Sequence, residues 1–487
     1  MLFNSYIFVF LFFPLVVAGY YWLHHVKLEK TALGYLIVMS MVFYGYNSVQ
    51  YLAILVVSIL VNYLLVKGMD RTRGLAGRRL FLMIGLLYNL GILFYFKYYD
   101  FFIENVNAVL KTDYRLLRLA LPLGISFYTF QQLSYVIDSY RGDCERYGLL
   151  EYAAYVCFFP QLIAGPIVYH DELIPQLRAG ENHHIRYENL CRGIYAFSLG
   201  MAKKVLVADT LSKVVTVGYE NVDALNSIST ILVMICYAMQ IYFDFSGYCD
   251  MAYGIGFMFN VELPVNFNSP YKAASVREFW DRWHMTLTRF FTKYVYIPLG
   301  GSRRGTVRTY GNTMIVFLVS GIWHGANWTF ILWGIVNGLG NLYDRLFDRI
   351  LQKIPRMFRI VVTFCFCTVA WSMFRAESVA QGLQMIGNLG VYGDGKLYGE
   401  IADVFNQIIE VRLLGRLGLQ PLIQTYPWFM LTVFVSLLLL ACLALRNTQE
   451  KVNDGRYGTK RILVIVGLLL WSILSLSEVS EFLYFNF

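Results

Sequence analysis

Charged residues are scarce in this chain. They make up 15% of its 487 residues, whereas hydrophobic residues make up 57% and the mean hydropathy is +0.50. A soluble protein of this length needs a largely polar and charged surface, which this composition does not supply. The composition therefore excludes a soluble fold and is typical of a helical protein that crosses a membrane several times.

A disulfide or metal-binding pattern of cysteines is also lacking. Most of the eight cysteines lie in apolar segments, and Cys365 and Cys367 are separated by one residue instead of two. No basic region precedes the first apolar run, so we expect a first spanning helix rather than a cleaved signal peptide. We expect neither thiol chemistry nor a metal site.

Acidic residues are outnumbered by basic ones. There are 41 Lys and Arg residues against 32 Asp and Glu, but the basic residues cluster in short gaps between apolar segments. This distribution orients helices in a membrane and is not typical of a nucleic-acid surface. With the clearest basic loop, 67–79, in the cytoplasm, both the N-terminus and the C-terminus are expected outside.

The apolar segments expected to cross the membrane are 5–22, 31–46, 50–66, 80–97, 360–374, 428–445 and 462–477. Segment 98–117 mixes charges with aromatic residues and predicts an interfacial helix. The segment 376–426 is expected outside. The topology of 149–210 stays open, because Lys203 and Lys204 interrupt a plausible span. No internal repeat is visible, which makes a secondary transporter less favoured, though still open.

Proline, glycine and polar residues interrupt three apolar stretches, at 121–132, 159–166 and 244–248. Broken helices at membrane depth are found where they are buried in protein or line a cavity. We therefore expect an irregular core rather than a plain helix bundle.

A histidine lies in the middle of the apolar stretch 311–340. Basic residues flank this stretch on both sides, so it is expected to enter the membrane and return on the same side. A helical arm from 312 to 323 reaches roughly 18 Å into the membrane, which puts His324 at the tip of a bend formed by Gly321 and Gly325. Ionisable groups at this depth are usually functional. A neutral imidazole that ties two helices together by one hydrogen bond is the alternative.

Upstream of this stretch, Ser275 and Glu278 form a capping-box pattern, which predicts a helix from here to about 297. On this helix Arg277, Asp281, His284 and Thr288 would share one stripe. The stripe is either functional or the solvent-exposed face of an interfacial helix with an Arg277–Asp281 ion pair.

The glycine-rich turn 299–305 that follows carries Arg303 and Arg304. Its backbone amides and guanidinium groups suit the phosphates of a cytosolic cofactor. Membrane orientation explains the same charges equally well.

Six motifs occur in one order: LPLGISFYTF at 121–130, FPQLIAGP at 159–166, QIYFDFSGY at 240–248, EFWDRWH at 278–284, YIPLGG at 296–301 and WHGANW at 323–328. With this ordered set the chain resembles the membrane-bound O-acyltransferase (MBOAT) family, in particular bacterial members that O-acetylate alginate, peptidoglycan and related polysaccharides.

The resemblance implies an all-α polytopic fold with about 10–12 spanning helices plus re-entrant and interfacial helices around a central tunnel. It implies one integral-membrane domain, 1–487, in the bacterial cytoplasmic membrane. Within it we expect N-terminal spans in 1–119, the catalytic core in 120–345 and C-terminal spans with an extracytoplasmic aromatic tail in 346–487.

The activity implied is transfer of an acyl group, acetyl in the first instance, from a cytoplasmic thioester such as acetyl-CoA. The final acceptor is an extracytoplasmic polysaccharide such as alginate or peptidoglycan, reached with a partner transferase. D-alanyl transfer to teichoic acid is the alternative within the family. A secondary transporter and a non-catalytic scaffold for the transferase are alternatives from other classes.

The resemblance also makes His324 the catalytic histidine and His284 the second motif histidine. A hydroxyl that attacks a thioester must lose a proton, and imidazole titrates in the right range, so we expect His324 to be the general base.

Among the other candidates, Asn327 or nearby backbone N–H groups are possible oxyanion donors. Asp281, Arg277, Asp244 and Gln240 are expected to support the site or to line the tunnel. Tyr484, in the C-terminal aromatic tail, is either an acyl relay or an interfacial anchor.

Overall fold

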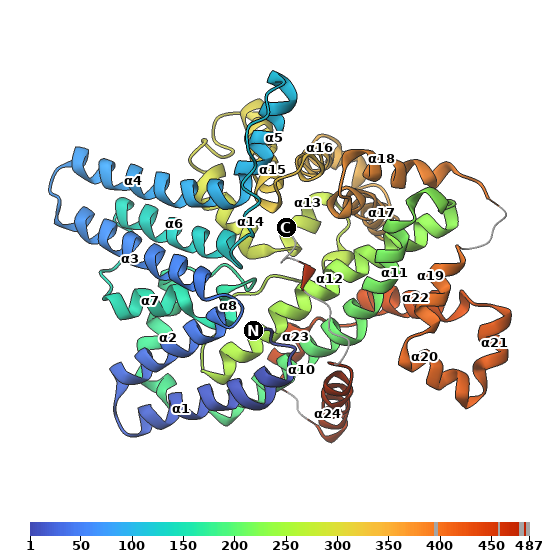
Figure 1. The fold of residues 1–487 in the computed structure, drawn as a ribbon, viewed down its shortest axis with the longest axis horizontal. Helices are drawn as coiled ribbons and strands as arrows, with labels where there is room; N and C mark the ends of the chain where they lie inside the picture. Colours follow the sequence, from blue (N-terminus) through green and yellow to red (C-terminus); the bar gives the residue numbers. More distant parts are fainter. Residues whose placement is uncertain (394–397, 456–457, 477–481, 484–487) are drawn as a thin grey trace. The chain divides into compact units, whose positions relative to one another are not determined.

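The computed structural model describes residues 1–393, 398–455, 458–476 and 482–483. Helices form nearly all of the regular structure (Figure 1), and the described residues contain no strand beyond an isolated antiparallel bridge between Phe267 and Trp283. The all-α expectation is confirmed. Tyr484 lies outside the described residues, so its proposed roles stay predictions.

The chain forms two compact units, each built from separate stretches of sequence. The first unit contains 1–200, 248–265 and 455–466, and the second contains 201–247, 266–454 and 467–487. These units cut across the three stretches expected from the sequence, so that division stays a prediction. Every candidate site residue that the structure describes lies in the second unit.

The helices that lie in or begin in the first unit are α1 (Phe13–His25), α2 (Glu29–Gly45), α3 (Val49–Arg71), α4 (Leu75–Leu93), α5 (Tyr99–Leu110), α6 (Ile125–Arg141), α7 (Leu149–Cys157), α8 (Phe159–Leu162), α9 (His170–Arg178) and α10 (Tyr187–Met201). α3, α4 and α6 lie side by side (Figure 1) around a buried amide network. Asn62 of α3 donates to Gln132 of α6 at 2.7 Å, and Asn89 of α4 donates to Asn62 at 2.6 Å. Such hydrogen bonds hold apolar helices in one register.

Two of the three predicted interruptions are confirmed. Gly124, at φ +73°, precedes α6, and a Cβ at this position would lie 2.7 Å from the carbonyl oxygen of Leu162. The second interruption leaves only the single turn α8 at Phe159–Leu162.

The third interruption, at 244–248, is wrong. α12 runs unbroken from Ser227 to Met258, through Gly247. A glycine inside a helix costs only about 1 kcal/mol relative to alanine, and the Asp244 carboxylate is satisfied by a lysine and a backbone amide.

The remaining helices are α11 (Asp209–Glu220), α12 (Ser227–Met258), α13 (Val276–Arg282), α14 (Met285–Phe291), α15 (Thr306–His324), α16 (Trp328–Leu351), α17 (Arg356–Arg375), α18 (Val379–Gly387), α19 (Gly399–Asn406), α20 (Ile409–Leu414), α21 (Gln420–Thr425), α22 (Phe429–Ala444), α23 (Thr448–Asn453) and α24 (Thr459–Leu474). Most of these lie in the second unit, whereas α12 and α24 have residues in both.

Several helices are long and apolar enough to cross a membrane. By length and composition, five such segments occur in the described part of the chain: Phe8–His25, Val49–Arg71, Leu75–Leu110, Ser227–Met258 and Arg356–Arg375. A sixth is Ile409–Thr425 with Phe429–Ala444, if this pair, bent by 102°, counts as one span. Other expected spans correspond to shorter helices, such as α2 with 17 residues and α24 with 16.

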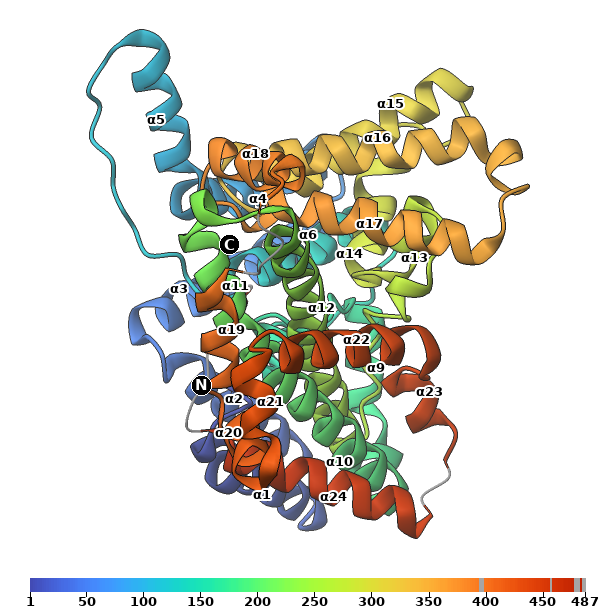
Figure 2. The ribbon, with the colours of Figure 1, turned by 90° about the vertical axis from the view of Figure 1, so that its right-hand side faces the viewer.

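α15 and α16 form a helical hairpin, as predicted for 311–340, and Figure 2 shows them side by side. Two glycines let the backbones touch. A Cβ on Gly321 would lie 2.5 Å from the carbonyl oxygen of Phe330, and one on Gly334 would lie 2.5 Å from that of Phe317. The hairpin is longer than expected, because α15 begins at Thr306 and α16 continues to Leu351.

The single helix expected from Ser275 to about 297 is wrong. α13 ends at Arg282, His284 adopts φ +46°, and α14 begins at Met285. The capping box is partly confirmed: Ser275 accepts from the Glu278 amide, but Glu278 accepts from Ala274 rather than from Ser275. Because of the break, His284 is buried while the rest of the predicted stripe is not.

Candidate functional site

His324 is the last residue of α15 and lies at the tip of the hairpin. It is 4% exposed and is surrounded by aromatic rings. Its imidazole centroid lies 4.9 Å from Trp323, 5.1 Å from Trp333 of α16 and 5.1 Å from Phe374 of α17. Rigid rings on all three helices therefore fix the position of this imidazole.

The two motif histidines share one neighbour. The Trp323 indole, which contacts His324, also lies 6.1 Å from the His284 ring. Phe245 of α12 also contacts this group, with its ring 4.8 Å from that of His284 at an interplanar angle of 86°. The structure thus brings His284 and His324 into one aromatic cluster, although they are distant in sequence.

The contacts of His284 define its tautomer. Asn266 Oδ1 accepts from the Thr286 backbone N–H at 3.1 Å and lies 3.3 Å from His284 Nδ1. Since this oxygen can only accept, Nδ1 carries the hydrogen, and Nε2 keeps its lone pair. In the neutral imidazole of His284, Nε2 is therefore the basic atom.

Burial also lowers the pKa of His284, to about 3. The unfolded chain binds a proton at this side chain below about pH 6.5, whereas the folded chain does not until about pH 3, so stability falls as the pH drops through this window. We expect His284 to account for about 2 kcal/mol of stability lost between pH 7 and pH 5. Unfolding midpoints in detergent at the two pH values measure this loss.

The matched variant is His284→Asn, since asparagine tolerates the positive φ at this position. Its midpoint is expected to depend less steeply on pH than that of the wild type. If the unfolding midpoints of the two proteins depend equally steeply on pH, His284 is not the source of the pH-dependent loss of stability.

Asn327 is placed as a helix cap. Its Oδ1 accepts from the Thr329 backbone N–H at 3.0 Å, and its amide donates to the carbonyl oxygen of Glu377 at 2.9 Å. Because the amide already donates to Glu377, backbone N–H groups are the better candidates for an oxyanion hole. A direct role of Asn327 stays a prediction.

Four charged candidates lie at the surface. Arg277 and Asp281 are exposed on α13, and the ion pair described on this helix joins Glu278 and Arg282 at 2.9 Å, not Arg277 and Asp281. Arg303 and Arg304 are exposed in the turn before α15. This turn and His324 are therefore at opposite ends of α15, roughly 28 Å apart along the helix.

Sequence reasoning named Asp244 and Gln240 as supporting residues but missed Lys204 and Asp209, which form a buried ion cluster with Asp244. Lys204 lies in a π-helical segment, Ala202–Ala208, and pairs at 2.7 Å with both Asp209 and Asp244. Gln240 is buried one turn before Asp244 on α12. The signal was present in the sequence as a lysine inside an apolar stretch with an aspartate five residues later, because an ionisable residue in such a setting needs a partner.

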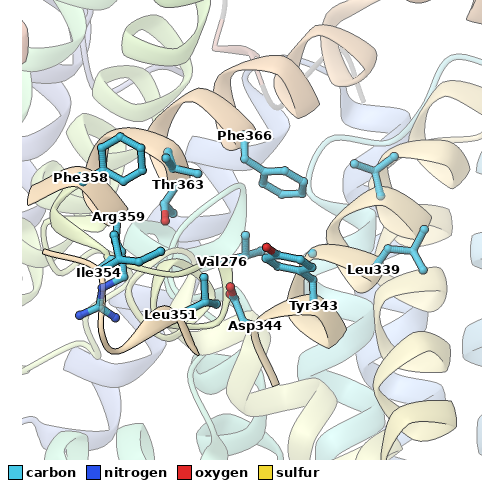
Figure 3. A pocket seen from close by; sticks show the side chains of 14 residues that line it. Val276, Leu339, Tyr343, Asp344, Leu351, Ile354, Phe358, Arg359, Thr363 and Phe366 are labelled. Carbon is cyan, nitrogen blue, oxygen red and sulfur yellow. The ribbon is translucent and has the colours of Figure 1, made fainter. Parts of the chain in front are cut away.

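A pocket of about 570 Å³ opens between α16 and α17 (Figure 3). Its lining is mostly apolar and includes Val276 at the start of α13, Leu339, Phe358 and Phe366. Asp344 is held there by the Arg277 backbone N–H at 3.0 Å. The pocket begins one turn along α16 from Trp333 and extends toward the end of the hairpin that carries the basic turn.

Among the residues described, no group of three or more His, Cys, Asp or Glu side chains is arranged to hold a metal ion. The described part of the second unit offers two buried imidazoles, a buried ion cluster and an apolar pocket as candidate functional features.

Comparison of the sequence with known proteins assigns the chain to a family. Residues 139–385 match the model of the membrane-bound O-acyltransferase family, MBOAT. The peptidoglycan O-acetyltransferase of Helicobacter pylori is 36% identical over 100% of this chain and 98% of that protein. The probable alginate O-acetylase AlgI of Pseudomonas putida is 35% identical over 100% of both.

A more distant relative is the teichoic acid D-alanyltransferase of Streptococcus thermophilus, which is 27% identical over 45% of this chain and 55% of that protein. The family match and the two full-length relatives confirm the resemblance seen in the motifs. This multi-pass membrane acyltransferase belongs to the membrane-bound O-acyltransferase family.

Proposed function

We propose that this protein transfers an acetyl group from cytoplasmic acetyl-CoA across the bacterial inner membrane for O-acetylation of a cell-envelope polysaccharide. A separate extracytoplasmic transferase completes the transfer, and both termini of the chain lie outside. The observation that carries the proposal is the buried His324 at the tip of a hairpin whose other end is basic. The names of the two full-length relatives support acetyl as the acyl group and peptidoglycan or alginate as the acceptor.

In the proposed reaction an acceptor hydroxyl attacks the thioester carbonyl. His324 removes the hydroxyl proton as the new C–O bond forms, and the C–S bond then breaks. The proton passes from the imidazolium to the departing thiolate, which leaves as coenzyme A thiol. Aromatic rings around His324 exclude water, which favours acyl transfer over hydrolysis.

His284 has a supporting role in this proposal. With Nδ1–H directed to Asn266, its Nε2 accepts a hydrogen bond from the donor or the acceptor and keeps it in position. The Trp323 indole contacts both imidazoles and so limits how far either can move.

The pocket between α16 and α17 is the place we propose for the arm of the donor. It is apolar, it contains Arg359, and it lies at the end of the hairpin near which Arg303 and Arg304 are found. An apolar channel with a few polar groups suits an extended thioester arm, and exposed guanidinium groups suit its phosphates.

Filling the pocket is expected to weaken donor binding. Leu339 lines the pocket, so we expect Leu339→Trp to raise KM for acetyl-CoA roughly tenfold with little change in kcat. Leu346→Trp, at an exposed position of the same helix outside the lining, is the control and is expected to behave as wild type. Equal KM values for the two variants would mean that the groove holds lipid rather than donor.

The proposed function is tested with inside-out vesicles that contain the purified protein and its acceptor system. Radiolabelled acetyl-CoA is added outside, on the original cytoplasmic face, and label is measured on the luminal acceptor. We expect luminal label that depends on the protein. Label from a D-alanyl carrier thioester instead would favour the alternative suggested by the teichoic acid relative, and passage of intact donor would favour a transporter.

A further inference from the structure

The loop that carries Asn266 fixes the backbone around His284. His284 has φ +46° and ψ +51°, a left-handed conformation that residues other than glycine rarely adopt. The loop is hydrogen-bonded to the chain on both sides of this histidine. The Asn268 N–H donates to the carbonyl oxygen of Arg282 at 2.9 Å. The Met285 N–H donates to that of Asn266 at 3.1 Å. A conformation of this kind persists only where the surrounding structure imposes it, and it is common at functional sites.

The side chain of Asn266 is buried, and three donors that the structure describes are directed at its amide oxygen. The Thr286 hydroxyl donates to this oxygen at 2.7 Å and the Thr286 backbone N–H at 3.1 Å, while His284 Nδ1 lies 3.3 Å away. A backbone N–H can only donate, so the atom that faces Thr286 is the amide oxygen rather than the nitrogen. Thr286 therefore fixes the orientation of the amide, and the amide fixes the tautomer of His284.

At this position asparagine differs from aspartate in charge rather than in shape. A carboxylate beside Nδ1–H would stabilise the imidazolium, whereas the neutral amide oxygen accepts the same hydrogen bond without adding a charge. An imidazolium carries a hydrogen on both ring nitrogens, so it can no longer accept a hydrogen bond through Nε2. A neutral partner at Nδ1 therefore keeps the Nε2 lone pair of His284 available to the reactants.

Other titratable and charged side chains are carried by the helices around this imidazole. Those nearest in sequence to its contacts are Asp244 on α12, Arg282 on α13, Arg289 on α14 and His324 on α15. The first two form ion pairs, with Lys204 and with Glu278. The last contacts the same Trp323 indole as His284. Asn266 contacts Nδ1 directly, so it is the residue through which the charge of this imidazole can be changed.

We propose that Asn266 is a positioning residue for acyl transfer, whose neutral amide holds His284 in the Nδ1–H tautomer and leaves Nε2 to accept a hydrogen bond from the reactants. This inference rests on the proposed function. The plain alternative is a purely structural contact, in which any acceptor of the same shape holds the break between α13 and α14 and its charge does not matter. Asn266→Asp separates the two ideas, because it keeps an acceptor oxygen in place and changes its charge.

The tautomer is measured by nitrogen NMR of histidine-labelled protein in detergent, with His284→Asn to identify the His284 signal. We expect the uncharged Nδ1–H form in the wild type at pH 5. In Asn266→Asp we expect the titration midpoint of His284 to rise by roughly 3 pH units, the upper end of the effect of an adjacent opposite charge, because the site is buried. An Nε2–H tautomer in the wild type, or an unchanged midpoint in the variant, would overturn the proposal. Neither measurement needs transfer activity.

The role in the reaction is measured as the pH dependence of kcat for acetyl transfer. Relative to the wild type, kcat of Asn266→Asp is expected to fall roughly tenfold per pH unit below the raised midpoint, because only neutral His284 accepts through Nε2, and to approach the wild-type value at pH 8. Asn341→Asp makes the same change at a buried asparagine of α16 that accepts from Arg345 at 3.1 Å, and is expected to keep the wild-type pH profile.

A wild-type pH profile in Asn266→Asp, once its raised midpoint is confirmed, would overturn the positioning role and leave only a structural contact. A wild type that transfers no acetyl group would instead refute the proposed function, and the NMR measurements would still decide whether Asn266 sets the tautomer and charge of His284.

Discussion

Replacing His324 by alanine is expected to lower kcat for acyl transfer by a factor of roughly 10² to 10⁴, the usual contribution of a general base. Alanine removes the imidazole proposed to accept the proton of the acceptor hydroxyl. Trp333 and Phe374 hold this imidazole at the tip of the hairpin. The measurement is the initial rate of acetyl transfer in vesicles at saturating donor.

Folding must be controlled in this experiment, since alanine leaves a cavity among the rings. His324→Gln keeps most of the volume and is expected to lose activity to a similar extent. His25→Ala removes an exposed histidine at the end of α1 and is expected to retain the wild-type rate. A well-folded His324→Ala protein with wild-type turnover would refute the proposed role.

The second large effect concerns the hairpin that presents His324. Gly334→Leu is expected to destabilise the protein by about 3 kcal/mol or more, because the new side chain meets backbone rather than a movable side chain. A Cβ at this position would lie 2.5 Å from the carbonyl oxygen of Phe317. The yield of monodisperse protein and the unfolding midpoint in detergent report this loss.

Gly311→Leu is the matched control for the hairpin. Gly311 is on α15, is exposed, and has no atom within 4 Å of a built Cβ. Leucine there is expected to be neutral or slightly stabilising, since it is a better helix former than glycine. If both leucine variants unfold at the same temperature, the close approach of α15 and α16 does not contribute to stability.

The hairpin and its histidine were predictable because the sequence marks both. Basic residues bracket an apolar stretch that has a histidine near its middle. Gly321, which was expected at the bend, instead lies inside α15, where it allows close contact with α16. The all-α fold and the family could also be predicted, because hydropathy and the order of the motifs can be read from the sequence alone.

The break before His284 was not predictable from periodicity. Apolar residues continue at helical spacing through 283–291, yet Asn266, from a preceding loop, accepts hydrogen bonds from Thr286 and ends the regularity. A contact between segments 20 residues apart in sequence overrode a local preference. The same holds for α12, where a polar pentapeptide stays helical because Lys204 satisfies Asp244 from another segment.

The division of the chain also bears on how the protein is made. The first unit is built from 1–200, 248–265 and 455–466, and the second takes the stretches between and after these. A ribosome that has synthesised 450 residues has therefore completed neither unit. Both units can be completed only after α24 has been synthesised, so a chain truncated before residue 455 lacks part of each unit rather than the whole of one.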